Sequence, residues 1–84
     1  MTISTQIDDI RQIVLKHARL VGASDAIDDD ADLYALGLNS LATVNVMLAL
    51  EDLYNVEFGD ELLSRETFAS IGAISRAINI LRGD

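Results

Sequence analysis

Leu36-Gly37-Leu38-Asn39-Ser40-Leu41 joins a glycine turn to the start of a strongly patterned segment, residues 40–54. Short polar side chains directly before a run with helical spacing are typical of a helix N-terminus. Asn39 or Ser40 can cap this helix, because a side-chain oxygen there accepts a backbone N–H that lacks a partner inside the helix. An exposed Ser40 hydroxyl at the positive end of a helix also suits the attachment of a phosphodiester. The local sequence leaves both roles of Ser40 open.

The helix predicted over residues 40–54 has two apolar faces. At about 100° per residue, one face collects Thr43, Val46, Met47, Leu50, Leu53 and Tyr54. The opposite face collects Leu41, Val44 and Leu48, flanked by Asn45, Glu51 and Asp52. A chain of 84 residues can hardly bury a helix all round. We therefore expect the first face to meet the core and the second to meet a partner protein.

A first helix is predicted from about residue 4 to about residue 21. Its apolar stripe recurs at steps of three and four residues: Ile3, Ile7, Ile10, Val14, Ala18 and Val21. We expect Gly22 to end the helix as a left-handed cap. His17, the only histidine, flanks the stripe and is interpreted as a partly buried structural residue.

Residues 23–39 keep no helical period and predict a long acidic loop. The run Asp28-Asp29-Asp30-Ala31-Asp32 imitates the start of a calcium loop. Leu33 and Asn39 stand where such a loop needs Gly and Glu, which excludes an EF-hand. The expected anchors of the loop in the core are Ile27, Leu33, Leu36 and Leu38.

Two short elements and a last helix are predicted after residue 54. Asp60 is expected to cap a turn that buries Leu62 and Leu63, and Ser64 to begin a second element that reaches Phe68. Ser70 is expected to cap the last helix, whose apolar stripe is Ile71, Ile74, Ile78 and Leu81. The predicted fold is all-α: a small up-and-down four-helix bundle with a long loop after the first helix and a short third helix. We expect residues 1–84 to form a single domain.

Composition limits the possible functions. The chain has no cysteine and one histidine, so disulfide frameworks, thiolate metal sites and histidine clusters are excluded, and no metal site is expected. The net charge of −8 disfavours nucleic acid and favours protein partners with Lys/Arg patches. We see neither a signal-peptide pattern nor an apolar stretch near the roughly 20 residues of a membrane span. A cytoplasmic protein is expected.

The sequence does not predict an enzyme. Nucleophilic catalysis by Ser40 would need a base and a group that orients this base. His17 lies on another predicted helix, and the residues around Ser40 do not form a Gly-x-Ser-x-Gly nucleophile elbow.

The string Asp32-Leu33-Tyr34-Ala35-Leu36-Gly37-Leu38-Asn39-Ser40-Leu41-Ala42-Thr43-Val44, followed by Ala49-Leu50-Glu51-Asp52-Leu53-Tyr54, resembles the acyl carrier protein family. The family pattern is Leu, Gly, an apolar residue and then Asp-Ser-Leu at the start of the second helix. The resemblance covers nearly the whole chain and implies that Ser40 bears 4′-phosphopantetheine, with Asn39 and Leu41 on either side. Cargo would be held as a thioester on the thiol of this arm. This chain has Asn39 where the family usually has Asp, which keeps the capping oxygen and removes the charge.

The resemblance also implies partners. These are a phosphopantetheinyl transferase, a ligase that loads an acyl group or an amino acid, and downstream acyl-processing enzymes with basic patches. The expected partner surface of this monomer is Leu41, Val44, Asn45, Leu48, Glu51 and Asp52.

The expected function is that of an acyl carrier protein in fatty acid, lipid or specialised-metabolite biosynthesis. The apolar segment 62–71 is similar to small stand-alone carriers that accept amino acids from ligases related to truncated tRNA synthetases, so an aminoacyl or peptidyl carrier stays open. The alternative of another class is an unmodified protein-interaction domain.

Overall fold

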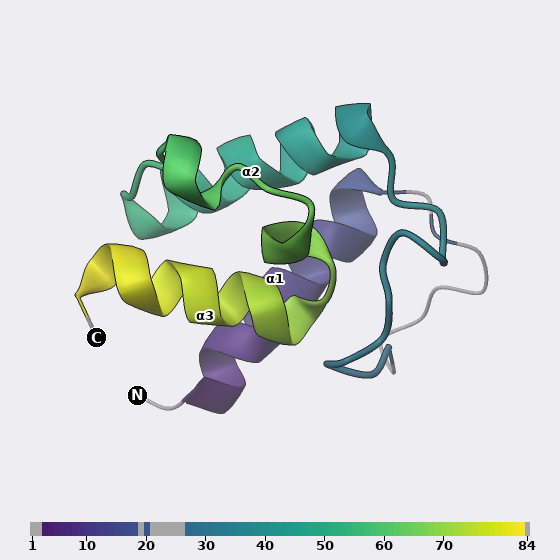
Figure 1. The fold of residues 1–84 in the computed structure, drawn as a ribbon. Helices are drawn as coiled ribbons and strands as arrows, with labels where there is room; N and C mark the ends of the chain where they lie inside the picture. Colours follow the sequence, from purple (N-terminus) through teal and green to yellow (C-terminus); the bar gives the residue numbers. More distant parts are fainter. Residues whose placement is uncertain (1–2, 19, 21–26, 84) are drawn as a thin grey trace.

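The structure is a computed structural model that describes residues 3–18, 20 and 27–83. These residues form three α-helices and two single-turn 3-10 helices, and they contain no strand: α1 (Ile3–His17), α2 (Ser40–Tyr54), η1 (Asp60–Leu62), η2 (Glu66–Phe68) and α3 (Ile71–Arg82). In Figure 1, α2 and α3 run in the same direction, and α1 runs the opposite way. The helix α1 packs against both of them. The all-α class is confirmed, and none of the described helices is long and apolar enough to span a membrane.

The segment between α2 and α3 is not a fourth α-helix. Phe58 and Phe68 are both buried, and their ring centroids lie 5.4 Å apart. A continuous helix over these ten residues would separate its ends by about 15 Å. Because both rings enter the core at nearly the same place, the chain between them folds back as the two turns η1 and η2. Leu63 was predicted to be buried in this segment, but it is 49% exposed.

The core lies between the three α-helices. Its largest fully buried side chains come from α1, the following loop, α2 and α3: Ile10, Val14, Leu33, Val46, Leu50, Ile71, Ile74 and Ile78. Burial of each such side chain stabilises the fold by about 1.5 to 3 kcal/mol relative to exposure. On α3 the predicted stripe is confirmed, with Leu81 packed against the core at its edge.

The helix α1 ends at His17 rather than near residue 21. Ala18 and Leu20 are both buried. On a continued helix, Leu20 would lie about 120° from the centre of the stripe that contains Ala18. Ending the helix after His17 therefore allows both residues to enter the core. Val21 and the predicted cap Gly22 lie outside the described residues.

On α2 the buried stripe is Ala42, Val46 and Leu50, while Thr43, Met47 and Tyr54 lie at its half-buried edge. The prediction that Leu53 belongs to the core is wrong, since its side chain is 53% exposed. The chain leaves the helix directly afterwards, through a left-handed Asn55. Phe58 then enters the core in this region, where the Glu51 carboxylate accepts its backbone N–H at 2.9 Å.

The described part of the loop, residues 27–39, is tied to the bundle. The predicted anchors are confirmed: Ile27, Leu33 and Leu38 are buried, and Leu36 packs against the core. The Leu33 N–H donates to the Ala69 carbonyl at 2.8 Å, and the Gly72 N–H donates to the Asp29 carbonyl at 2.9 Å. Backbone hydrogen bonds therefore fix this loop to η2 and to the first turn of α3.

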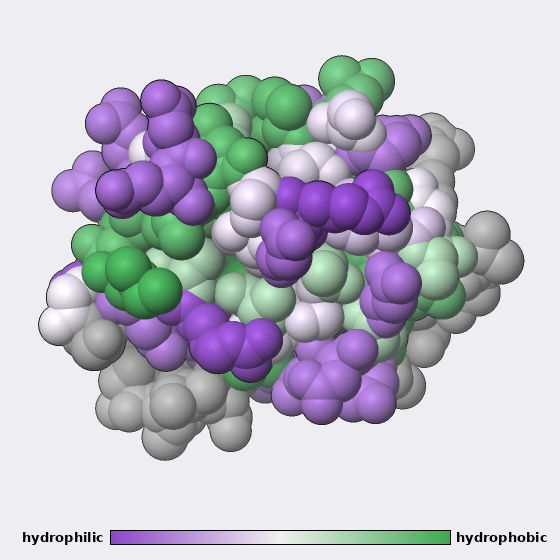
Figure 2. All heavy atoms as spheres, viewed as in Figure 1, coloured by the Kyte–Doolittle hydropathy of each residue, from purple (hydrophilic) through white to green (hydrophobic). Residues whose placement is uncertain are grey.

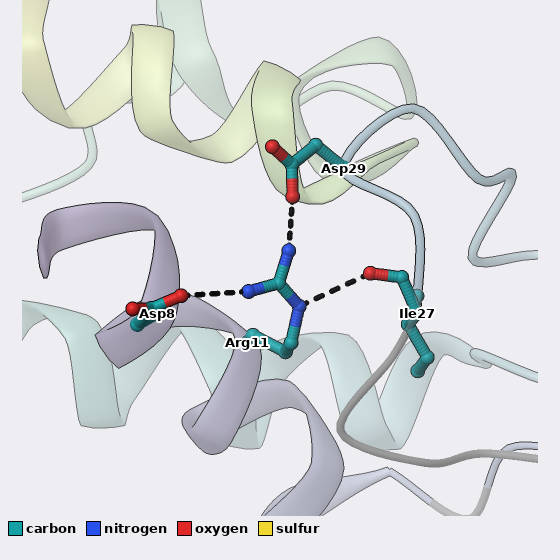
Figure 3. Close-up of polar contacts among 4 residues, drawn as sticks. All are labelled: Asp8, Arg11, Ile27 and Asp29. Carbon is teal, nitrogen blue, oxygen red and sulfur yellow. Dashed lines mark hydrogen bonds and ion pairs between the residues drawn. The ribbon is translucent and has the colours of Figure 1, made fainter. Parts of the chain in front are cut away.

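Arg11 fixes the same loop to α1 (Figure 3). Its guanidinium donates to the Ile27 carbonyl at 3.1 Å, to the Asp8 carboxylate at 2.9 Å and to the Asp29 carboxylate. The Arg11 side chain is only 14% exposed. A charge-assisted hydrogen bond of this kind is about twice as strong as a neutral one. One side chain therefore joins α1 to the loop that leads to Ser40.

Candidate functional site

The first turn of α2 settles which residue caps the helix. Asn39 has an extended backbone, and its side-chain oxygen accepts the Ala42 N–H at 2.8 Å. Its carbonyl oxygen accepts both the Thr43 N–H at 2.8 Å and the Thr43 hydroxyl at 2.7 Å. Asn39 is thus the cap, and Ser40 is the first helical residue.

The Ser40 side chain is exposed and takes no part in the cap. Within the described part of the chain, its hydroxyl has no hydrogen-bond partner, and the backbone N–H groups of Ser40 and Leu41 donate to no other residue. Unpaired N–H groups and the helix dipole make such an end attractive to an anion. The hydroxyl is therefore accessible at a place where a phosphate group is favoured.

The turn before Ser40 explains how it is presented. Asp32 holds the start of this turn, because its carboxylate accepts the backbone N–H of Tyr34 at 3.0 Å and of Ala35 at 3.3 Å. Gly37 has φ = 121°, a backbone conformation that residues other than glycine rarely adopt. Leu38 then returns to the core, with its N–H bonded to the Leu33 carbonyl at 2.9 Å. Ser40 follows this anchor after one residue, at the surface.

A groove of about 380 Å³ opens beside Ser40. One wall comes from α2 and the other from the loop and the segment around η2; the lining residues are Tyr34, Ser40, Thr43, Val44, Met47, Leu63, Ser64, Arg65 and Phe68. Thr43, Val44 and Met47 follow Ser40 at helical spacing, so the sequence pattern could have placed them beside it. Tyr34 and Arg65 were missed, because only the folded chain brings their two segments to the groove.

Tyr34 and Arg65 are paired at the rim of this groove. The Arg65 guanidinium carbon lies 3.9 Å from the centre of the Tyr34 ring, and the Tyr34 hydroxyl donates to the Arg65 carbonyl at 3.0 Å. Partial burial raises the pKa of Tyr34 above its ordinary value, although the Arg65 charge acts in the opposite direction. The pair connects the loop to the segment before η2.

His17 lies on the other flank of the first turn of α2. It borders a second hollow of about 200 Å³ together with Gly37, Asn39, Leu41, Ala42 and Asn45. His17 is half-buried, as expected for a structural residue. It does not border the groove that contains Ser40, and the described residues contain no hydrogen bond between the two side chains. The structure therefore brings Asn39, Leu41 and Asn45 together on this flank, and Ser40 with Val44 on the other.

The outward face of α2 is apolar, as the sequence predicted. Leu41 is 73% exposed, Leu48 53% and Val44 46%. Figure 2 shows hydrophobic residues at the surface over α2, along the upper edge of the view. Asn45 and Asp52 on this face are also exposed, whereas Glu51 is half-buried with its carboxylate bonded to the Phe58 N–H. Of the two acids expected to meet a partner, Asp52 is thus the accessible one.

A small all-α chain that presents an exposed serine at the start of a long helix, beside an open groove, has the arrangement of a carrier protein. Comparison with known proteins agrees. The sequence model of the family described as "Phosphopantetheine attachment site" matches residues 8–78. The chain belongs to this family and is a carrier protein with covalently attached phosphopantetheine as its cofactor.

Two relatives and one solved structure describe the similarity further. The chain is 46% identical to the "Aminoacyl carrier protein" of Agrobacterium fabrum, over 86% of this chain and 87% of that protein. It is 31% identical to the "Acyl carrier protein" of Wolinella succinogenes, over 84% and 90% of the two chains. The fold is similar, with a TM-score of 0.80 and 44% identity, to a carrier protein chain from Agrobacterium tumefaciens, covering 88% of this chain and 97% of that chain. That carrier protein was crystallised with an engineered Bradyrhizobium japonicum glycine:[carrier protein] ligase and ATP.

The residues around Ser40 fit the phosphopantetheine group. A phosphodiester needs an accessible hydroxyl and favours a helix N-terminus, and Ser40 offers both. Because Asn39 caps the helix, the Ser40 hydroxyl is not needed as a capping group and is free for attachment.

Proposed function

We propose that Ser40 carries the phosphopantetheine arm. The observation that supports this most directly is the division between two neighbours: Asn39 caps α2, and the exposed Ser40 hydroxyl is left without a partner among the described residues. Leu41, the next residue, has an apolar side chain that is 73% exposed and lies beside the attachment point. When bound, the arm supplies a thiol on which cargo is held as a thioester.

We further propose that the cargo is an amino acid. The identity to an aminoacyl carrier protein is 46%, against 31% to an acyl carrier protein over nearly the same length. The similar carrier protein chain of known structure was crystallised with a glycine:[carrier protein] ligase. This proposal narrows the broader expectation of an acyl carrier to its aminoacyl alternative, which the segment 62–71 had also suggested.

The proposed partners are a phosphopantetheinyl transferase, an amino acid:carrier protein ligase and the enzyme that accepts the loaded amino acid. The apolar strip of Leu41, Val44 and Leu48 would supply affinity, while the exposed Asn45 and Asp52 would orient a basic partner. The Glu51 carboxylate, which was also expected on this surface, is bonded to the Phe58 N–H instead. The chain itself performs no catalysis in this proposal: Ser40 accepts the arm, and partner enzymes carry out each reaction.

We propose that residues 1–84 form one carrier domain. The buried side chains of the core form one cluster, to which α1, the loop, α2, the segment between α2 and α3, and α3 all contribute.

Intact-mass analysis tests the attachment. Incubation with a phosphopantetheinyl transferase and coenzyme A should add one phosphopantetheine to the chain, and Ser40→Ala should abolish this addition. Ser64→Ala is a matched control, because Ser64 is also exposed and borders the same groove. It should be modified as fully as the unaltered chain.

Loading of the modified chain then tests the cargo. Incubation with an amino acid:carrier protein ligase, ATP and an amino acid should add one aminoacyl group, which a thiol reagent applied beforehand should block. Loading by a fatty acyl ligase and not by the amino acid ligase would contradict the aminoacyl assignment alone. A chain that never gains the arm would instead support an interaction domain that uses only the exposed face of α2.

A further inference from the structure

The hollow that His17 borders, beside the first turn of α2, has no acidic residue among those that line it. Three of its lining side chains, His17, Asn39 and Asn45, carry N–H groups that can donate hydrogen bonds. The Asn39 oxygen is used to cap α2, but its amide nitrogen is not. Within the described part of the chain, none of these three side chains donates a hydrogen bond to another residue. The hollow therefore offers donors to an acceptor from outside the chain.

This flank of α2 is also an exception to the negative charge of the protein. The chain carries 14 acidic residues, yet the segment 33–50 contains no charged side chain. Lys16, next to His17 in the last turn of α1, is exposed. Among the residues that the structure describes, no carboxylate forms an ion pair with Lys16. A carboxylate that enters the hollow thus approaches a cation and meets no like charge on the walls.

We propose that this hollow is a docking site for an aspartate or glutamate side chain of the amino acid ligase that loads the arm. The inference rests on the proposed aminoacyl function. Asn45 and His17 would donate hydrogen bonds to the carboxylate, and hydrogen bonds to an ionised acceptor are stronger than neutral ones. Leu41, which also lines the hollow and is 73% exposed, would pack against apolar atoms around the carboxylate. The end of α1 therefore joins the outward face of α2 in the partner surface.

The two ends of this partner surface select opposite charges. Asp52 follows Asn45 by seven residues on α2, a separation of about 10 Å along the helix axis, and its exposed carboxylate favours a base on the partner. The hollow favours an acid. Opposite preferences along one helix fix the direction in which the ligase lies on α2, because the reversed direction would bring like charges together.

Charge substitutions at Asn45 test the sign of the partner surface. The protein carrying the arm is loaded by an amino acid:carrier protein ligase with ATP, and kcat and KM for the carrier are measured. Asn45→Asp should raise KM about two- to fivefold, the factor that corresponds to an exposed ion pair, with little change in kcat. Asn45→Lys should lower KM by a similar factor. Both differences should shrink at high salt, because salt screens exposed charges.

Two further variants complete the test. Asn55→Asp makes the same change at an exposed position just beyond the other end of α2 that does not border the hollow, and its KM should not rise. His17→Phe keeps a ring of similar size and removes the N–H donor, so its KM should rise about two- to fivefold. Circular dichroism should show equal helix content for the Asn45 and Asn55 variants, because both side chains are exposed.

The outcomes separate this docking site from the proposed function. If the ligase loads none of the chains, the unaltered one included, the aminoacyl function is overturned and this docking site with it. Normal loading with the same KM for Asn45→Asp and the unaltered chain overturns the docking site alone. A lower KM for Asn45→Asp also overturns it, because the partner would then be basic at this end of α2. An equal rise of KM for Asn55→Asp would assign the effect to net charge and overturn it as well.

Discussion

Leu48 and Leu50 test the orientation of α2, because they have identical side chains two residues apart and face opposite environments. Leu50 is fully buried, and Leu48 is 53% exposed. Leu50→Ala should lower the free energy of unfolding by about 2 to 5 kcal/mol, the usual cost of a truncated core leucine. For a domain of this size, that corresponds to a fall in melting temperature on the order of 10 to 30 °C. Leu48→Ala should cost about 1 kcal/mol at most, since half of the side chain already meets water.

The ranking should reverse in a loading assay at a temperature where both variants are folded. If Leu48 contacts the ligase, its truncation removes about 1 to 2 kcal/mol of binding, so kcat/KM for loading falls roughly 5- to 30-fold. Leu50→Ala should load at nearly the normal rate. A destabilised Leu48→Ala that loads normally, together with a stable Leu50→Ala that loads poorly, would refute the orientation and exchange the core face of α2 with the partner face.

Three further predictions concern the surroundings of the site. Arg11→Met keeps the packing of the side chain and removes three hydrogen bonds, so it should lower the free energy of unfolding by about 1 to 3 kcal/mol. It should also speed hydrogen exchange at the Gly72 N–H, which is bonded to the Asp29 carbonyl. Unchanged exchange would mean that Arg11 does not hold the loop. Asn39→Asp keeps the capping oxygen and restores the charge usual in the family, so transferases of fatty-acid carriers should modify this variant faster than the unaltered chain. Equal modification rates would show that these transferases do not recognise the charge. Asn39→Ala, which removes the cap, should lower the free energy of unfolding by about 0.5 to 2 kcal/mol. Burial raises the pKa of both Tyr34 and Tyr54 in the folded state, so unfolded chains lose these protons first. The contribution of the two tyrosines to stability should therefore be constant below about pH 10 and be lost above it. Urea unfolding at about pH 8 and about pH 10.5, on either side of the ordinary tyrosine pKa, measures this loss of stability. The loss should be smaller for Tyr54→Phe than for the unaltered chain.

The elements that the sequence predicted well are those whose ends carry local signals. The bounds of α2, Ser40–Tyr54, agree with the prediction, because Asn39 caps one end and Asn55 adopts the left-handed conformation at the other. Ser70 caps α3 as expected, with its hydroxyl accepting the Ala73 N–H at 3.0 Å. A cap and an apolar period are both readable within a few residues, so neither depends on the rest of the fold.

The errors occur where distant residues compete for the same space. Leu53 lies on the core side of α2 by its spacing, but Phe58 enters the core after the turn at Asn55. The helix α1 ends at His17, and Leu20 is buried although a continued helix would turn it away from the core. In the same way, Arg65 reaches the groove beside Ser40 only because Phe58 and Phe68 meet in the core and fold the chain between them back on itself. None of these placements follows from local spacing.

Asn39 and Ser40 illustrate how the fold separates structure from function at adjacent positions. The sequence alone left the capping role open between them, and a capping serine would need its hydroxyl for the helix. With Asn39 as the cap, the Ala42 N–H is already satisfied, so Ser40 contributes its backbone to the helix and leaves its hydroxyl available. Substitution of Ser40 therefore removes a chemical group that the described fold does not use. The proposed attachment site can consequently be altered without weakening the helix that presents it.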